Sequence, residues 1–311
     1  MASLRCRRDP CGVICLILTY FSVFYADYVV IQYVLIPAYS GSVWCTLHGS
    51  VFNLILLLLL ACHAKAVFSD PGMVPLPDTA IDFSDLRSQS SRMSERVSHK
   101  GCEGWTVCSR CETYRPPRAH HCRVCQRCIR RMDHHCPWIN NCVGELNQKY
   151  FIQFLFYTGM ASLYSMVLVV SAWVWRIRNE RDGDAEKEAE TPSKHLIVAH
   201  YIILLVESVL FGVFVMVIFY DQLVSIITDE TPIEQMKNRL MLKDRGSSSS
   251  SASTSSSSQL PHHPPHTRKP KLALLREVFG RGSVFCWLLP LHSSPPSVGG
   301  IIYSALPDYD V

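Results

Sequence analysis

The chain has 311 residues, of which 48% are hydrophobic and only 18% are charged, and its formal net charge is +4. Soluble domains contain about 25% charged residues, so this composition argues against an ordinary cytosolic globular protein. It also excludes a wholly disordered chain and a strongly basic nucleic-acid-binding protein.

Four apolar segments are each long enough to cross a bilayer, which requires about 20 residues. They cover approximately Cys11–Pro37, Trp44–Val67, Phe151–Trp175 and Leu196–Ile218. The first is too long for a signal-peptide core and no small-residue cleavage site follows it before the second, so we expect a retained span. We therefore predict an all-α polytopic membrane protein, with transmembrane helices 1 and 2 within 11–67 and helices 3 and 4 within 151–227.

The basic residues indicate the orientation of these spans. Most of the 30 Lys and Arg residues lie in the N-terminal tail, the segment between the second and third spans, and the C-terminal tail, whereas loop 38–43 contains none. Cytosolic loops are enriched in Lys and Arg, so both termini and the central segment are predicted to face the cytosol. Five basic residues in loop 176–194 weaken this prediction without reversing it.

Three polar residues, Asp27, Asn53 and Glu207, interrupt the spans. A carboxylate near the middle of a membrane helix costs about 2.5–3.5 kcal/mol on insertion scales unless it is paired or protonated. We favour hydrogen bonding between helices as their role, with the lining of a cavity as the alternative.

Outside the spans, composition divides the chain further. The expected parts are a cytosolic N-terminal tail at 1–10, a polar connector at 68–104, a cysteine-rich domain at 105–150, a cytosolic segment at 228–245, a disordered Ser/His/Pro-rich linker at 246–270, and a C-terminal amphipathic segment and tail at 271–311.

Eight of the 14 cysteines fall between Cys102 and Cys142. This segment faces the cytosol in the predicted topology, where metal binding by thiolates is more common than disulfide formation. Three Cys-x-x-Cys pairs have the spacing that lets two sulfurs bind one tetrahedral Zn²⁺. They are Cys108/Cys111, Cys122/Cys125 and Cys125/Cys128.

The number of potential ligands points to one cysteine with another role. Residues 108–142 contain seven cysteines and four histidines, whereas two closed zinc sites use four ligands each. Adjacent side chains rarely bind the same ion, so each pair, His120/His121 and His134/His135, is expected to provide one ligand. Cys136, which follows a histidine pair and precedes a proline, is then the natural surplus thiol.

The neighbours of Cys136 suit nucleophilic catalysis. His134 can remove the thiol proton and Asp133 can orient the imidazole, and nearby arginines favour the thiolate. This pattern favours an enzyme that forms thioesters, with a membrane-tethered structural zinc-finger adaptor as the alternative. A metal transporter is disfavoured because the histidines cluster outside the spans, and a nucleic-acid finger because the segment is held between two spans.

These motifs resemble those of the DHHC family of protein S-acyltransferases, and most closely its Golgi-resident subgroup, which includes the Golgi-apparatus-specific DHHC zinc-finger protein. The matching residues extend over most of Val13–Met236. They include Asp70-Pro71-Gly72, Arg115-Pro116-x-Arg118-x-x-His121-Cys122, Asp133-His134-His135-Cys136-Pro137-Trp138, and Asn141-Cys142-Val143-Gly144 with Asn147.

The resemblance implies a palmitoyltransferase of a Golgi or other endomembrane, with Cys136 as the acylated nucleophile, His134 as its base and Asp133 polarising the base. Acyl-CoA would be the co-substrate, and membrane-associated proteins with cytosolic cysteines would be the acceptors. The implied ligands of two structural zinc ions are Cys108, Cys111, His121 and Cys128 for one, and Cys122, Cys125, His135 and Cys142 for the other.

Two positions depart from the family pattern. Thr231-Pro232-Ile233-Glu234 has proline at the second threonine of the family's TTxE motif, which is expected to weaken any contact made there. In the C-terminal segment, Leu274 stands where an asparagine is usual. Neither residue belongs to the expected catalytic group.

Three further expectations concern binding. Arg127, Arg130, Arg131 and Lys149 are candidate partners for the CoA phosphates, although a solvated surface role is the alternative for each. Ala161 lies about 15 Å into the third span, where related enzymes close the acyl pocket; packing between helices is the alternative. The C-terminal Tyr309-Asp310-Val311 is a weak candidate for a PDZ-type groove.

Overall fold

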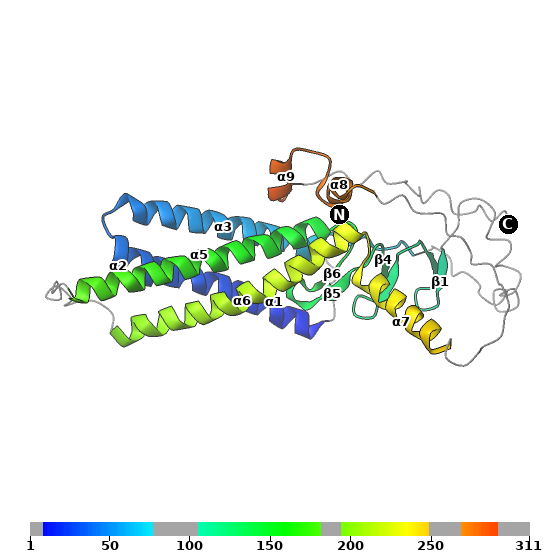
Figure 1. The fold of residues 1–311 in the computed structure, drawn as a ribbon, viewed down its shortest axis with the longest axis horizontal. Coiled ribbons are helices and arrows are strands. Elements are labelled where there is room, and N and C mark those ends of the chain that lie inside the picture. Colours follow the sequence, from blue (N-terminus) through cyan, green and yellow to red (C-terminus); the bar gives the residue numbers. More distant parts are fainter. Residues whose placement is uncertain (1–8, 77–104, 182–193, 249–268, 292–311) are drawn as a thin grey trace, which may run out of the picture.

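The computed structural model describes residues 9–76, 105–181, 194–248 and 269–291. Four long helices run side by side along the long axis of the molecule, and a group of short strands lies at one end (Figure 1). The described helices are largely α, and four of them are long and apolar enough to cross a membrane. The predicted fold class is therefore confirmed.

The first candidate span contains a change of helix type. α1 (Pro10–Val29) begins with proline at its first turn, continues through the π-helical turn η1 (Val30–Leu35) and ends with α2 (Ile36–Tyr39). Proline is favoured at this position because the first turn of a helix has no partner for its N–H. α3 (Val43–Phe68) forms the second span, and the hydroxyl of Ser42 caps its N-terminus.

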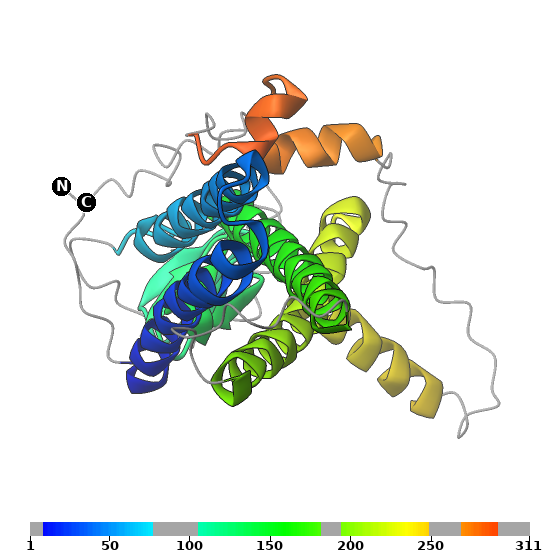
Figure 2. The same cartoon turned by 90° about the vertical axis from the view of Figure 1, so that its left-hand side faces the viewer.

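The third and fourth spans are longer than their apolar runs predicted. α5 covers Gln148–Arg181 and α6 covers Lys194–Thr228. α5 packs against both α3 and α6, and Figure 2 shows the helices end on around this centre. Polar residues at the strand-side ends of α5 and α6, such as Gln148 and Gln222, are buried against the rest of the protein. These turns of α5 and α6 are polar because protein rather than lipid covers them. The apolar runs therefore end before the helices do.

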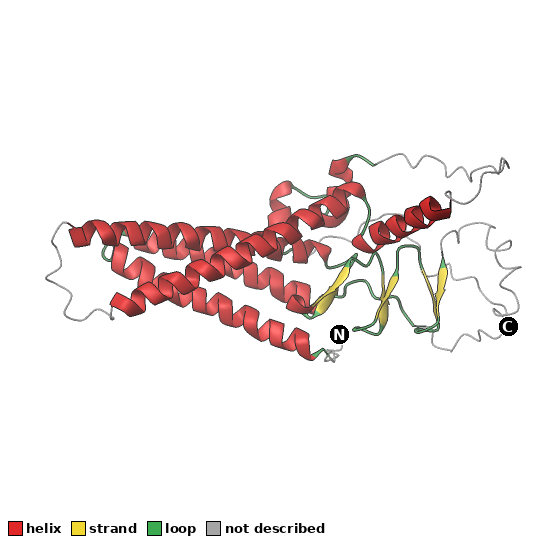
Figure 3. Cartoon of the chain, turned by 60° about the horizontal axis from the view of Figure 1, so that its bottom comes forward, coloured by secondary structure: helices red, strands yellow, loops and turns green. Residues whose placement is uncertain are grey.

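The cysteine-rich segment consists of three antiparallel hairpins in a row (Figure 3). Their strands are β1 (Thr106–Cys108) with β2 (Thr113–Arg115), β3 (His120–Cys122) with β4 (Arg127–Ile129), and β5 (His134–Cys136) with β6 (Asn141–Val143). Isolated two-stranded hairpins are only marginally stable in water. The row therefore needs cross-links between hairpins and support from the helices.

Two sequence motifs lie where α3 meets the hairpins. Asp70 accepts hydrogen bonds from the N–H groups of Gly72 and Met73, and Gly72 has φ +101°, which favours glycine. The amide of Asn141 donates to the carbonyls of Ala66 and Ser69 at distances of 3.0 Å each. These bonds satisfy carbonyls that a helix leaves unpaired at its C-terminus.

Three further helices follow α6 in the described part of the chain, α7 (Pro232–Ser248), α8 (Lys271–Phe279) and α9 (Val284–Leu288). Of these, α8 packs against the strand-side ends of α5 and α6. Leu274 of α8 is 3% exposed and clusters with Ile152 of α5 and Ile226 of α6. The C-terminal segment that was predicted to be amphipathic therefore packs against α5 and α6. Most of the predicted connector and linker, and the residues 309–311, lie outside the described residues.

Candidate active site and metal centres

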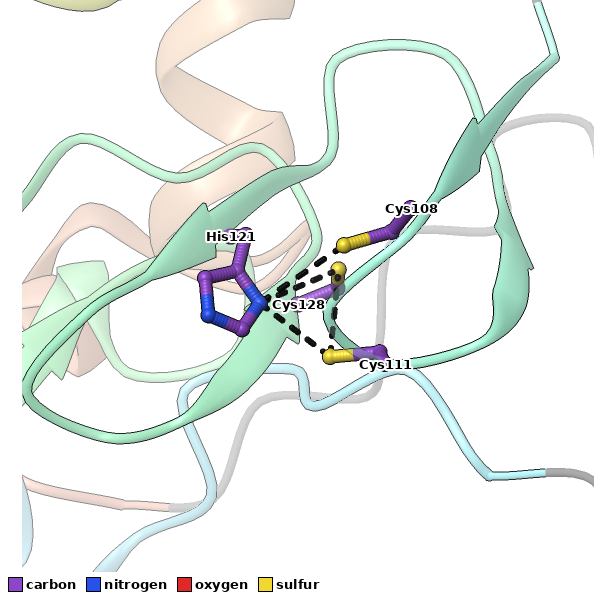
Figure 4. A group of neighbouring side chains, drawn as sticks. All are labelled: Cys108, Cys111, His121 and Cys128. Atoms are coloured by element: carbon purple, nitrogen blue, oxygen red, sulfur yellow. Dashed lines mark hydrogen bonds between the residues drawn. The ribbon is translucent and has the colours of Figure 1, made fainter.

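The first cluster joins the first and second hairpins. Cys108 and Cys111 belong to the β1–β2 hairpin, whereas His121 and Cys128 face each other across β3 and β4. His121 Nδ1 lies 3.7, 3.1 and 3.9 Å from the sulfurs of Cys108, Cys111 and Cys128 (Figure 4). Ligands of a tetrahedral Zn²⁺ are about 3.3–3.8 Å apart, given bonds of about 2.0–2.3 Å. The donor set and its spacing fit a zinc ion.

The second cluster joins the second and third hairpins in the same way. His135 Nδ1 lies 3.8, 3.4 and 3.6 Å from the sulfurs of Cys122, Cys125 and Cys142. Each cluster has four potential ligand atoms within 4.8 Å of one another. Three sulfurs and one imidazole would complete the coordination of one zinc ion, so neither cluster leaves an open position for substrate.

Asp9 contacts the second cluster from outside. Its Oδ2 lies 3.2 Å from Nε2 of His135, the ring nitrogen that does not face the sulfurs. A carboxylate in this position fixes the orientation and tautomer of a metal-binding imidazole. The sequence analysis did not single out Asp9, which immediately precedes the first span.

The three hairpins share one register, and this explains the surplus thiol. Cys108 pairs with Thr113, Cys122 with Arg127, and Cys136 with Asn141, so each cysteine ends the first strand of its hairpin. Three residues further on, the first two hairpins have Cys111 and Cys125, whereas the third has Ile139. Cys136 therefore occupies the position of a metal ligand but lacks the second sulfur of a Cys-x-x-Cys pair.

Cys136 lies at the boundary between the third hairpin and the helices. Its side chain is 6% exposed and belongs to neither of the two clusters found among the described residues. It lines a cavity between the helices, and the other six cysteines of 108–142 belong to the clusters. The structure thus separates this sulfur from the metal sites and places it beside an apolar space.

Asp133 and His134, three and two residues before Cys136, form a hydrogen-bonded pair. His134 Nδ1 lies 2.6 Å from Asp133 Oδ2, and the Asp133 side chain is 2% exposed. Burial lowers the pKa of His134, but the interactions with Asp133 and Cys136 outweigh burial and raise it to about 9. The electrostatic environment of His134 therefore favours its imidazolium form. Because Nδ1 contacts Asp133, Nε2 remains for the thiol.

A buried glutamine completes this group. Gln222 of α6 donates through Nε2 to Asp133 Oδ2 at 2.6 Å. Gln222 lies beyond the predicted fourth span, and the polar residues expected to matter within the spans were only Asp27, Asn53 and Glu207. The sequence signal that could have identified Gln222 is a glutamine placed near the end of an apolar run.

The cavity extends from Cys136 between the helices. Phe52, Leu56 and Leu59 of α3 and Phe151, Leu155 and Ala161 of α5 contribute to its walls. Glu207, Ser208, Ser162 and Ser165 also line it, and the hydroxyls of Ser165 and Ser208 are 2.8 Å apart. The walls near Cys136 are mainly apolar and suit an alkyl chain.

Three of the basic residues expected near CoA have partners within the protein. Arg130 pairs with Glu145, and Arg131 pairs with Asp229 and Glu277. Lys149 is buried and donates to the carbonyls of Cys286 and Leu291. The structure thus assigns Lys149 to holding the C-terminal segment, whereas Arg127 is partly exposed.

Pro232 leaves the hydrogen bonds between Thr231 and Glu234 in place, whereas the weakening of contacts made by residue 232 itself stays a prediction. Pro232 occupies the first turn of α7, where its missing N–H has no helical partner to lose. Glu234 Oε2 accepts from the N–H of Thr231 at 2.8 Å, and Thr231 Oγ1 accepts from the N–H of Glu234 at 3.4 Å. This is a capping box. Arg118, in the loop before β3, binds Glu234 at 2.7 Å and Asp229 at 2.8 Å.

Comparison with known proteins agrees with this geometry. Residues 102–239 match the model of the family described as DHHC palmitoyltransferase. The chain is 41% identical to palmitoyltransferase ZDHHC3 of Homo sapiens over 74% of this chain and 72% of the relative. It is 36% identical to palmitoyltransferase ZDHHC7 of Rattus norvegicus over 74% and 70%, and 30% identical to probable protein S-acyltransferase 12 of Arabidopsis thaliana over 78% and 72%.

Proposed function

The chain belongs to the DHHC palmitoyltransferase family, and we propose that it transfers a long-chain acyl group from acyl-CoA to cysteine thiols of membrane-associated proteins through Cys136. It is a multi-pass membrane protein and a protein S-acyltransferase, as the sequence predicted. The observation that supports the role of Cys136 most strongly is its position, outside both metal clusters and on the wall of the apolar cavity.

The proposed reaction has two steps on one sulfur. In the first, His134 takes the proton of Cys136, the thiolate attacks the carbonyl carbon of acyl-CoA, and the bond to the CoA sulfur breaks. The departing CoA thiolate takes the proton from His134. In the second, the acceptor thiol gives its proton to His134 and attacks the acyl carbon, and Cys136 leaves as a thiolate. Asp133 orients His134 and stabilises the imidazolium in both steps.

The two Cys₃His clusters are proposed to bind one Zn²⁺ each. The ligands would be Cys108, Cys111, His121 and Cys128 in one site, and Cys122, Cys125, His135 and Cys142 in the other. When bound, the ions would cross-link three hairpins that are too short to be stable separately. The residues that perform the chemistry, Asp133, His134 and Cys136, remain outside both sites.

The acyl chain is proposed to lie in the cavity, with its carbonyl at Cys136 and its tail passing Ala161. Burying a methylene group contributes about 0.8 kcal/mol, so the shape of this cavity would influence which acyl-CoA reacts fastest. The hydrophobic tail would stay between the helices while the anionic CoA remains on the cytosolic side.

We also propose the location of the protein and the parts of its chain. Both termini and the hairpins face the cytosol, which the distribution of Lys and Arg supports. The division into tail, spans, cysteine-rich domain, linker and C-terminal segment follows the sequence. Similarity to a Golgi-resident subgroup favours the Golgi or another endomembrane. Residues 309–311 would offer a C-terminal carboxylate to a PDZ-type partner.

The decisive experiment compares Cys136→Ser with Cys286→Ser in the full chain. After incubation with labelled palmitoyl-CoA, the wild-type protein and Cys286→Ser are expected to carry a hydroxylamine-sensitive adduct that moves to a peptide thiol. Cys286 is the control because it is an exposed cysteine of α9, outside the motif. Cys136→Ser should lack the adduct and keep its zinc content. An adduct of normal yield on Cys136→Ser would refute the assignment of the nucleophile.

A further inference from the structure

Gln222 brings a transmembrane helix into direct contact with the Asp133–His134 pair. It lies near the strand-side end of α6, 89 positions from Asp133 in the sequence, and its side chain is 2% exposed. Its Nε2 donates to Asp133 Oδ2 at 2.6 Å, and the same oxygen lies 2.6 Å from His134 Nδ1. One carboxylate oxygen therefore accepts both contacts.

The Asp133 carboxylate has few other restraints. Within the described part of the chain, its Oδ1 is buried and has no hydrogen-bond partner. The last side-chain torsion of aspartate has only broad preferences, so covalent geometry does not fix the plane of this carboxylate. Its orientation depends on the two donors at Oδ2, and Gln222 is the donor that takes no part in proton transfer.

A second glutamine fixes the orientation of the first. Gln148, in the first turn of α5, donates through Nε2 to Gln222 Oε1 at 3.4 Å. Because the Gln222 oxygen accepts this bond, its NH₂ group faces Asp133, where a carboxylate requires a donor. The resulting chain of contacts runs from α5 through α6 to the third hairpin.

We propose that Gln222 is a positioning residue for acyl transfer. Its amide holds Asp133 so that His134 keeps the Nδ1 proton directed to the carboxylate and presents Nε2 to the Cys136 thiol. The packing of α5 against α6 thereby sets the geometry of the reacting groups. This inference rests on the proposed function of Asp133, His134 and Cys136 and adds a residue from the membrane bundle to it.

Two substitutions separate positioning from simple packing. Gln222→Met has about the same length but no donor, and Gln222→Glu has the same shape but directs a carboxylate at Asp133. Positioning predicts that the single-turnover rate of acyl-enzyme formation falls in the order wild type, Met, Glu. Packing alone predicts that methionine serves as well as glutamine.

The expected loss for Gln222→Met is about 10-fold to 100-fold in the maximal acylation rate, because the variant removes a hydrogen bond to a charged group. The palmitoyl-CoA concentration at half-saturation should stay unchanged, since Gln222 is not among the residues that line the cavity. Gln148→Met, which removes only the support for Gln222, should give a smaller loss and provides a second test if Gln222→Met does not fold.

Gln153→Met is the matched control. Gln153 is also a buried glutamine near the strand-side end of the bundle, but its Nε2 donates to the carbonyls of Trp287 and Leu289, at 2.7 and 2.8 Å. This variant is expected to lower thermal stability while retaining a larger fraction of the acylation rate than Gln222→Met. Zinc content and thermal unfolding, measured on each full-length variant, correct the rates for misfolded protein.

Three results would overturn the proposal. They are a normal acylation rate in folded Gln222→Met, an equal loss in Gln153→Met, or a changed half-saturation with an unchanged maximal rate. The Cys136→Ser variant shows which of the two proposals fails, the positioning role of Gln222 or the proposed function. If Cys136→Ser lacks the adduct and Gln222→Met reacts normally, only the positioning role fails; if Cys136→Ser is acylated, the proposed function fails.

Discussion

At the scale of single residues, alternation along short strands separates the proposed metal ligands from the proposed reacting groups. Successive side chains of a strand point to opposite faces. His121 belongs to the first cluster, whereas the adjacent Cys122 belongs to the second. In the next hairpin, His135 belongs to the second cluster and Cys136 lines the cavity. His134 is two positions from Cys136 and so lies on the same face. A one-residue shift in this strand would exchange the roles of base and ligand.

Ala161 is the residue at which the length of the bound acyl chain can be tested. It lines the cavity and is 9% exposed, so the ring in Ala161→Phe is expected to occupy space that a long chain uses. Each methylene displaced would raise the half-saturating acyl-CoA concentration about fourfold, from about 0.8 kcal/mol per buried methylene. Single-turnover assays across a series of acyl-CoAs should show a preference shifted to shorter chains.

The control for this substitution is Leu163→Phe. Leu163 lies two residues further along the same helix, is 60% exposed in the bundle and is not among the residues that line the cavity. Its chain-length profile is expected to match that of the wild type. An unchanged profile in Ala161→Phe, accompanied by lower stability, would assign Ala161 to helix packing instead.

At the scale of elements, polar contacts at helix ends join parts that are distant in the chain. The capping box of Thr231 and Glu234 begins α7, and Arg118 binds the same glutamate from the loop before β3. The amides of Asn141 and Asn147 bond to carbonyls at the end of α3 and at Cys142. Arg118 and Asn141 belong to recognisable motifs, but their partners Glu234 and Ala66 lie elsewhere in the sequence.

The docking of α8 gives a prediction at this scale. Leu274 is 3% exposed between Ile152 and Ile226, whereas Leu272 on the same helix is 51% exposed. Leu274→Ala should destabilise the docked segment by about 2–5 kcal/mol, because it leaves a cavity among apolar side chains. Limited proteolysis of residues 269–291 should be faster in this variant.

Leu272→Ala provides the comparison, because an exposed leucine loses little packing when it is shortened. Its cleavage rate is expected to stay within about twofold of the wild type. Equal cleavage rates for the two variants would contradict a role of Leu274 in anchoring the C-terminal segment.

At the scale of the whole molecule, two parts with different sources of stability meet at the active site. The bundle is apolar along its length and exposes residues such as Leu163, Leu210 and Val213, which a bilayer would cover. The hairpins have three-residue strands and sulfur-lined interiors. Cys136 belongs to the hairpins by sequence and to the bundle by its contacts, so the site requires both parts.

Removal of metal should therefore affect the two parts differently. Treatment with a zinc chelator is expected to abolish acylation of Cys136, because the hairpins lose their proposed cross-links. The far-UV circular dichroism of the helices should be largely retained, since their hydrogen bonds lie within each helix. Restored acylation on adding Zn²⁺ would support this order of events, whereas full acylation of the metal-depleted protein would contradict a structural role for the ions.

The sequence by itself predicted four spans, indicated a cysteine- and histidine-rich segment able to bind two metal ions, and singled out Cys136 as the surplus thiol. These features depend on local spacing and on counting: apolar runs of membrane length, Cys-x-x-Cys gaps, and seven cysteines with two histidine pairs where two zinc sites use eight ligands. Local spacing survives in the primary sequence, so it can be recognised without a structure.

Only the tertiary structure decided which parts meet around that thiol. The contact of Gln222 with Asp133, that of Asp9 with His135, and the engagement of Lys149 by the C-terminal segment join residues that are distant in the chain. No spacing rule connects such residues, because their proximity depends on how whole helices pack. The same packing created the cavity beside Cys136, whose walls come from four separate helices.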